Sequence, residues 1–226
     1  MYIYEIKITQ SDCPHIDVTN EFRDVYILVM NTMEEMETQK MFSVVYSRSQ
    51  EDLTSALKLL DSHRLVNELE LISRRPNVAA IFYEMQETSM YRRTAREGFR
   101  IHPMVAHRGM ERWFVVCKRD RSANEIYRAD ETTRILSARQ LSSEEFLHVY
   151  PSVFYDLQLL QLFGDLTESD FRLLKVAFNT GYFEWPRKVD LAELSRIMSL
   201  PKSTLSYKLR QIDRKIAKVV DERLSG

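Results

Sequence analysis

Short apolar segments with strand periodicity alternate with helical ones through the first 140 residues, and the order occurs twice. In the first half, the pattern predicts strands over 2–8, 25–30, 42–47 and 66–73, with a helix over 50–62. In the second half, it predicts a strand over 78–84, a helix over 88–97, a hairpin of strands 99–106 and 110–117, and a helix over about 122–136. Both halves approach the β-α-β-β-α-β order of ferredoxin-like units, although the pattern gives the first half no opening helix.

These elements predict an α+β protein. Antiparallel sheets with helices on one face are the economical packing, and two ferredoxin-like units in tandem would resemble the ACT-like modules that bind small effectors at sheet edges. We therefore expect a regulatory or oligomerisation domain over 1–141, with 1–75 and 76–141 as a duplicated unit. A connecting segment over 142–165 would follow, with a short helix capped by its Ser-Ser-Glu-Glu start and an apolar stretch over 154–160 that can pack against a neighbour or form a dimer contact.

The last third of the chain, 166–226, changes to helical spacing throughout, which predicts an all-α domain. Thr167 is a suitable N-cap for a first helix, and Gly181 can end that helix in the left-handed conformation. Asp190 can cap a short second helix, whose inward stripe is expected to be Leu191, Leu194, Ile197 and Met198. The tight turn 199–203 then leads into a third helix over about 202–220. A short helix, a tight turn and a longer helix form a helix-turn-helix.

The third helix has two chemically different faces. At about 100° per residue, its apolar side chains fall on one face, namely Leu205, Leu209, Ile212, Ile216 and Val219. The opposite face carries hydroxyl, phenol and guanidinium groups, from Ser203, Tyr207, Arg210 and Arg214, with Ser206 beside them. Such groups contact phosphates and base edges when a helix enters the major groove of DNA, so this face predicts a recognition helix.

Charge supports this interpretation locally. The chain has a net charge of −1, but the nine basic and three acidic residues between 185 and 218 give that segment +6, which leaves −7 for the rest. A basic segment on an acidic body indicates a polyanionic partner for that segment alone. A solvated helix face would show the same charge, so the geometry of the helix has to decide.

Three C-terminal segments form a distinctive set, namely Gly181-Tyr182-Phe183-Glu184-Trp185-Pro186-Arg187, Ser203-Thr204-Leu205-Ser206 and Leu209-Arg210. They resemble the DNA-binding domain of archaeal bacterio-opsin-activator-type regulators. The resemblance implies a helix-turn-helix transcription factor. The opening segment around Asp12-Cys13-Pro14 also looks like the start of the N-terminal domain that accompanies this module in archaeal relatives.

Together, the helix geometry and the resemblance predict a sequence-specific regulator that binds double-stranded DNA. Its DNA-binding residues are expected to be Arg187, Lys202, Ser203, Thr204, Ser206, Tyr207, Arg210 and Arg214. We expect a homodimer, with an unknown small-molecule effector as a further partner. The alternatives are a small-molecule-processing enzyme and a protein-binding adaptor, each with the helix-turn-helix as an appendage.

The sequence shows no glycine-rich phosphate loop, metalloprotease helix or nucleophile elbow, so we expect no enzymatic activity and no cofactor. Two cysteines, Cys13 and Cys117, are too few for a disulfide framework, and no signal peptide or membrane span is evident, which favours the cytoplasm. Cys13 and His15 could converge with the distant Cys117, His102 or His107. Their spacing matches no standard zinc pattern, so we predict no metal site, and sensing by either cysteine is left open.

Overall fold

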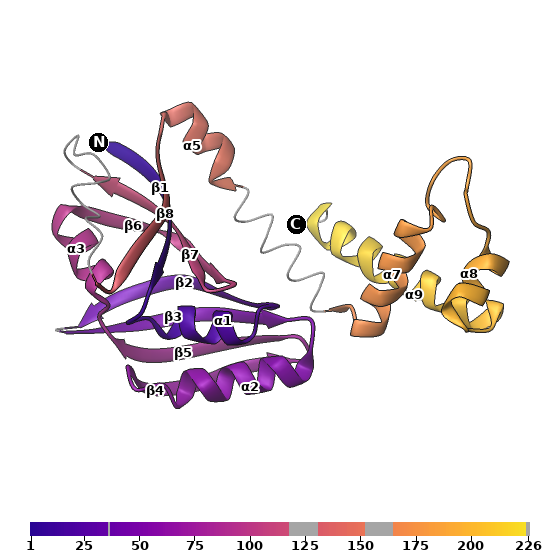
Figure 1. Cartoon of the computed structure of the whole chain (residues 1–226), viewed down its shortest axis with the longest axis horizontal. Coiled ribbons are helices and arrows are strands. Elements are labelled where there is room, and N and C mark those ends of the chain that lie inside the picture. Colours follow the sequence, from indigo (N-terminus) through magenta and orange to yellow (C-terminus); the bar gives the residue numbers. More distant parts are fainter. Residues whose placement is uncertain (36, 118–130, 152–164, 225–226) are drawn as a thin grey trace. The chain divides into compact units, whose positions relative to one another are not determined.

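The computed structural model describes residues 1–35, 37–117, 131–151 and 165–224. The chain divides into two compact units, Met1–Gln158 and Leu159–Gly226 (Figure 1). The predicted domain boundaries at 141 and 165 stay predictions. No helix among the described residues is both long and apolar enough to cross a membrane.

One antiparallel sheet forms the first unit, as the α+β prediction requires. Its described strands are β1 (Tyr2–Gln10), β2 (Val25–Glu35), β3 (Thr38–Ser47), β4 (Val66–Arg75), β5 (Val78–Gln86), β6 (Gly98–His107), β7 (Met110–Cys117) and β8 (Thr133–Leu141). They lie in the order β4-β5-β3-β2-β6-β7-β1-β8. The two predicted ferredoxin-like halves are thus joined in one continuous sheet, and they meet where β2 pairs with β6.

Each half of this sheet contains one strand from the other half of the sequence. β5 lies between β4 and β3, and β1 lies between β7 and β8. If each of β1–β4 is replaced by its counterpart in β5–β8, and the reverse, the strand order becomes the observed order read from the other edge of the sheet. The sheet therefore has an internal pseudo-symmetry. Alternating apolar positions predict that a strand is half-buried but do not say which strand lies beside it, so the sequence could not predict this exchange.

Three helices contribute to the main core, α1 (Pro14–Glu21), α2 (Gln50–Asp61) and α3 (Ser89–Glu97), and α1 touches α2. The core combines side chains such as Ile6, Ile27 and Ile81 of the strands with Leu53 of α2. A smaller cluster lies on the other face of the sheet, where α5 (Ser143–Val149) packs against Phe114. The Ser142–Glu145 capping box that starts α5 confirms the predicted cap. The apolar stretch 154–160 lies outside the described residues.

Two sequence predictions differ from this fold. The first half does have an opening helix, α1, which the pattern missed because two of its buried residues, His15 and Thr19, are polar. The helix predicted over 122–136 is wrong at its end, because β8 begins at Thr133 and pairs with β1. The part of that prediction between 118 and 130 lies outside the described residues.

The second unit contains α7 (Glu168–Asn179), α8 (Leu191–Met198) and α9 (Lys202–Leu224), as the helical spacing predicts. Its core is made by apolar residues of all three helices, among them Leu173, Leu194, Leu205 and Ile212. Thr167 caps α7 in a reciprocal box with Asp170. Gly181, at φ +77°, ends α7 as predicted: its N–H donates to the carbonyl of Phe178, and the next N–H donates to Ala177.

Candidate nucleic-acid interface

The junction of α8 and α9 is a tight, internally hydrogen-bonded turn. Asp190 caps α8 by accepting a 2.8 Å hydrogen bond from the N–H of Glu193. Ser199 adopts the left-handed conformation at φ +53°, which reverses the chain in one residue. The N–H of Leu200 then donates to the carbonyl of Ser195, and α9 starts with the hydrogen bond from Leu205 N–H to the carbonyl of Pro201. The turn therefore fixes the start of α9 against α8.

α9 has the two faces that its sequence predicts. Leu205, Leu209 and Ile212 are buried in the core of the unit. Six of the predicted DNA-binding residues are exposed, namely Arg187, Lys202, Ser203, Tyr207, Arg210 and Arg214, and the other two, Thr204 and Ser206, are half-buried. Tyr207 exposes 63% of its surface. A tyrosine that served only to pack the helix would bury most of its ring. One face of α9 therefore holds the helix in place and leaves the other open.

Two of the predicted arginines have local partners that restrict their side chains. Arg210 Nη2 donates a 3.1 Å hydrogen bond to Ser206 Oγ, one turn earlier on the same face. Arg187 lies in the connection between α7 and α8, and its guanidinium stacks over the ring of Tyr182 at 4.8 Å. These contacts orient both groups while leaving them exposed.

The basic residues of α9 form two sets, one directed toward α7 and one exposed on the open face. The number of charges in the sequence does not distinguish them. Lys208 Nζ donates to Ser169 Oγ at 3.2 Å, and Lys215 Nζ makes a 2.7 Å ion pair with Asp170. Both lysines therefore point toward the start of α7, away from the face that carries Arg210. They hold the unit together and are not part of the open basic face.

The pKa of Asp170 lies below its ordinary value. Burial alone would raise it, but the hydrogen bond from Lys215, the backbone and side chain of Thr167 and the lysine's charge lower it by more. A carboxyl whose pKa is depressed by folding stabilises the protein above its unfolded pKa of about 3.9, and the stabilisation is lost as pH falls through the lowered value.

We therefore expect Asp170→Asn to lower the free energy of unfolding by about 1 kcal/mol at neutral pH, because it removes the ion pair and weakens the cap. The difference from the wild type should shrink as the pH falls below the unfolded pKa of about 3.9, and it should vanish below the lowered pKa of the folded carboxyl, where wild-type Asp170 is also protonated. Chemical unfolding of the full chain at several pH values measures this difference. Asp213→Asn, which removes an exposed acid of α9, is the control; equal pH dependence for both variants would contradict the prediction.

Three residues of the second unit differ from the helix-turn-helix prediction or lie outside it. Ile197, placed in the inward stripe of α8, is 49% exposed, since the short helix buries only Leu194 fully. The side chain of Val219, assigned to the apolar face of α9, lies outside the described residues. Trp185, in the connection beside Arg187, is 95% exposed, although it is not among the predicted DNA-binding residues. The aromatic residues just before it, Tyr182 and Phe183, were the feature of the sequence that could have drawn attention to Trp185.

Cys13 and His15 do converge with a distant residue, but it is none of the three suggested by the sequence, Cys117, His102 and His107. Cys117 pairs with Tyr2 at the start of β1, whereas Cys13 follows the end of that nine-residue strand, about 25–30 Å away at roughly 3.3 Å per residue. His102 bonds the carbonyl of Val29, and His107 stacks on Tyr26. The residue that does join Cys13 and His15 is Glu111.

Comparison with protein families assigns both parts of the chain. Residues 3–133, more than half of the chain, match the model HVO_2525_N, described as N-terminal. The chain belongs to the HVO_2525_N family. In this member, residues 166–218 match a second model, described as HTH DNA binding domain. That match covers α7, the turn and most of α9, and it confirms the resemblance to the bacterio-opsin-activator-type module. Comparisons with curated proteins and with solved structures found no match.

Proposed function

We propose that this protein is a sequence-specific transcriptional regulator that inserts the exposed face of α9 into the major groove of DNA. The family match supports DNA binding by the C-terminal unit. The observation that carries the finer assignment is the arrangement of Tyr207, Arg210 and Arg214, exposed opposite a face buried in the core. A recognition helix has to be held from behind and remain open in front, and α9 meets both conditions.

The roles proposed for the individual groups follow from their chemistry. Lys202, Ser203 and Thr204 lie at the start of α9, where free backbone N–H groups and the helix dipole favour a phosphate. Arg210 can donate two parallel hydrogen bonds to O6 and N7 of a guanine. Tyr207 can contact a phosphate or the methyl group of a thymine.

The remaining predicted residues support these contacts. Ser206 restricts the guanidinium of Arg210 through the hydrogen bond between them, which reduces the entropy lost on binding. Arg214 extends the basic face by one turn, and Arg187 can reach the backbone of the DNA from the connection before α8.

For the first unit, we propose a sensing or oligomerising role over residues 1–141. A homodimer would present two recognition helices to half-sites about 34 Å apart, which is one turn of DNA. An analytical ultracentrifugation run with and without DNA tests the stoichiometry. A monomer that binds a single, non-repeated site with full affinity would refute the dimer.

The experiment that tests the function is selection of bound duplexes from a random pool by the full chain, followed by fluorescence anisotropy on the enriched sequence. A regulator of this kind should bind the selected duplex at least 1,000-fold more tightly than random DNA at about physiological salt. Equal affinity for both at every salt concentration would contradict sequence-specific recognition.

Lys202→Ala should weaken binding to the selected duplex and to random duplexes by a similar factor, because a phosphate contact carries no sequence information. The slope of log affinity against log salt should also fall by about 1, the effect of one phosphate contact. Anisotropy titrations at four or more salt concentrations measure both quantities. A loss confined to the selected duplex would mean that Lys202 contacts a base.

A further inference from the structure

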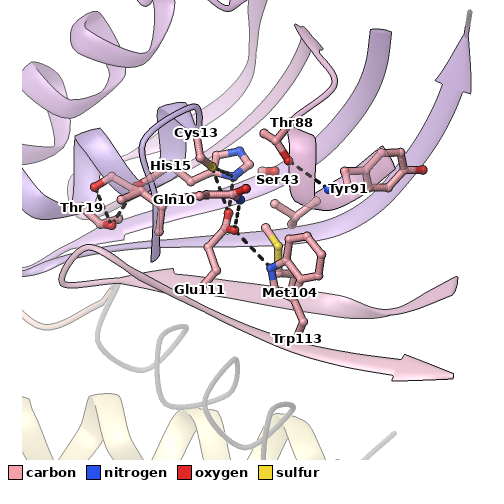
Figure 2. Close-up of polar contacts among 12 residues, drawn as sticks. Gln10, Cys13, His15, Thr19, Ser43, Thr88, Tyr91, Met104, Glu111 and Trp113 are labelled. Carbon is pink, nitrogen blue, oxygen red and sulfur yellow. Dashed lines mark hydrogen bonds and ion pairs between the residues drawn. The ribbon is translucent and has the colours of Figure 1, made fainter. Parts of the chain in front are cut away.

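Three side chains with different metal-binding atoms meet inside the sheet unit, beneath the start of α1. Cys13 is the N-cap residue directly before α1, His15 lies in the first turn of that helix, and Glu111 is the second residue of β7. All three are buried to 1% exposure. Figure 2 shows them pointing toward one another, and one ligand atom of each lies within 4.8 Å of the others.

The triangle of ligand atoms has the dimensions of a tetrahedral metal site. Cys13 Sγ and His15 Nδ1 are 3.6 Å apart, Cys13 Sγ and Glu111 Oε1 are 3.2 Å apart, and Nδ1 and Oε1 are 2.9 Å apart. Zinc bonds of about 2.3 Å to sulfur and about 2.0–2.1 Å to nitrogen and oxygen place tetrahedral ligands about 3.3–3.6 Å from each other. One of the three edges already agrees, and the other two need to widen by only a few tenths of an ångström.

The atoms of these residues that face away from the triangle have partners of their own. His15 Nε2 lies 2.6 Å from the hydroxyl of Tyr83. Glu111 Oε2 accepts hydrogen bonds from Gln10 Nε2 at 2.7 Å and Trp113 Nε1 at 3.2 Å. Such outer contacts orient the ligands of a metal site and are a regular part of its construction. They leave Sγ, Nδ1 and Oε1 facing one another.

A small cavity borders the triangle, and one of the residues that line it, Gln10, has a spare oxygen. Its volume is about 10 Å³, and its lining includes the three ligand residues, Gln10 and Gln39. This is roughly the space of one water molecule, too small for an organic substrate, which argues against a cysteine nucleophile. Gln10 Oε1 is buried and has no hydrogen-bond partner among the described residues. A buried oxygen of this kind lacks the partner that such groups nearly always have.

The charge of the surroundings restricts the kind of ion. Arg100 also lines the cavity, held over the rings of Tyr91 and Trp113 at 4.2 and 4.7 Å. The positive charge of its guanidinium disfavours ions that are bound mainly by negative charge, such as Ca²⁺ and Mg²⁺. These two ions also prefer oxygen ligands. A thiolate, an imidazole and a carboxylate together suit a borderline-soft divalent ion, which forms stronger bonds to sulfur and nitrogen.

We propose that Cys13, His15 and Glu111 bind one divalent transition-metal ion of the zinc class. A water molecule or the spare oxygen of Gln10 completes the four-coordinate shell. The ligands come from the segment after β1 and from β7, and the outer partner Tyr83 comes from β5, so the ion would connect both halves of the sheet. The site is independent of DNA binding by α9.

The test is Co²⁺ substitution in the full chain, refolded with the metal under reducing conditions because the site is closed to solvent in the folded protein. Tetrahedral Co²⁺ with one thiolate ligand gives a charge-transfer band in the near ultraviolet and intense visible bands, and an excess of Zn²⁺ present with Co²⁺ during refolding should prevent both. We expect one Co²⁺ per chain. Cys13→Ser should abolish the charge-transfer band, and Glu111→Gln should weaken Co²⁺ binding at least about 10-fold.

Cys117→Ser is the matched control, since it removes the other buried cysteine of the same sheet and should leave the bands unchanged. Circular dichroism establishes whether each variant is folded. The wild-type chain decides the outcome by itself if a variant fails to fold. A refolded wild type that takes up no stoichiometric Co²⁺, or bands that survive in folded Cys13→Ser, would overturn the proposal and leave the cluster as a hydrogen-bonded core.

Discussion

Neither half of the sheet unit is expected to fold when residues 1–75 and 76–141 are produced as separate chains. The first fragment contains β4, β3 and β2 but lacks β5, which lies between β4 and β3. The second contains β6, β7 and β8 but lacks β1, which lies between β7 and β8. Each fragment therefore loses an interior strand and both of its ladders of hydrogen bonds.

The energetic loss is larger than a domain of this size can absorb. β1 buries Tyr4, Ile6 and Ile8, and β5 buries Ile81 and Tyr83. Each large apolar side chain contributes about 1.5–3 kcal/mol when fully buried, whereas a whole domain is stable by only about 5–15 kcal/mol. Losing either strand also exposes the core side chains that pack against it, so the sum of these losses exceeds the stability available.

Far-ultraviolet circular dichroism and proton NMR dispersion measure the state of each fragment. We expect disordered spectra for both fragments alone and recovery of strand signal when they are mixed, because each supplies the strand that the other lacks. The uncut chain under the same conditions is the control. A cooperative unfolding transition in either isolated fragment would show that its half is an independent domain, contrary to the strand order.

Arg210→Ala is expected to lower the affinity for the selected duplex by about 1–3 kcal/mol, or about 5- to 150-fold, and to change the affinity for random DNA much less. The reason is that Arg210 is exposed on the open face of α9, where a bidentate contact to guanine is within its chemistry. The preference for guanine at one position of the selected sequence should relax in the same variant.

Lys208→Ala provides the matched control. It removes the same charge from the same helix, two residues earlier, but its side chain points toward Ser169 of α7. We expect it to leave the preference for the selected duplex almost unchanged. Equal effects of the two substitutions would mean that α9 acts through its net charge alone, and the assignment of the recognition face would fail.

The helix-turn-helix could be predicted from the sequence in some detail because its determinants are local. Thr167, Gly181 and Asp190 act on the chain within a few residues of themselves, as caps and helix ends. The apolar period of α9 depends only on the helical repeat, so Leu205, Leu209 and Ile212 identified the buried face directly. The face open to a partner followed from it.

The sheet unit was predictable only as a set of strands. Its exchange of β1 and β5 depends on pairings between distant segments, such as Ile6 with Trp113, which no local pattern encodes. The separation of basic residues on α9 into two sets also depended on a tertiary contact, because Lys215 finds its partner Asp170 45 positions away.

Glu111 was missed for a related reason. Its partners His15 and Gln10 lie 96 and 101 positions earlier in the chain. A signal was nevertheless present, because Trp113 and Val115 are the inward positions of β7 and the alternation places Glu111 on the same face. A carboxylate at an inward strand position is rare without buried partners, and it should prompt a search for them.

The proposed function requires the open face of α9 to contact the DNA. Replacing Tyr207 by the photoreactive aromatic residue p-benzoylphenylalanine measures this contact, with Lys208, which points toward Ser169 of α7, replaced in the same way for comparison. Irradiation of the full chain on its selected duplex, with excess random DNA present, should cross-link position 207 to the duplex far more efficiently than position 208. Binding of the duplex without any cross-link from position 207, or with a cross-link from position 208 alone, would show that another face of α9 or another part of the chain meets the DNA.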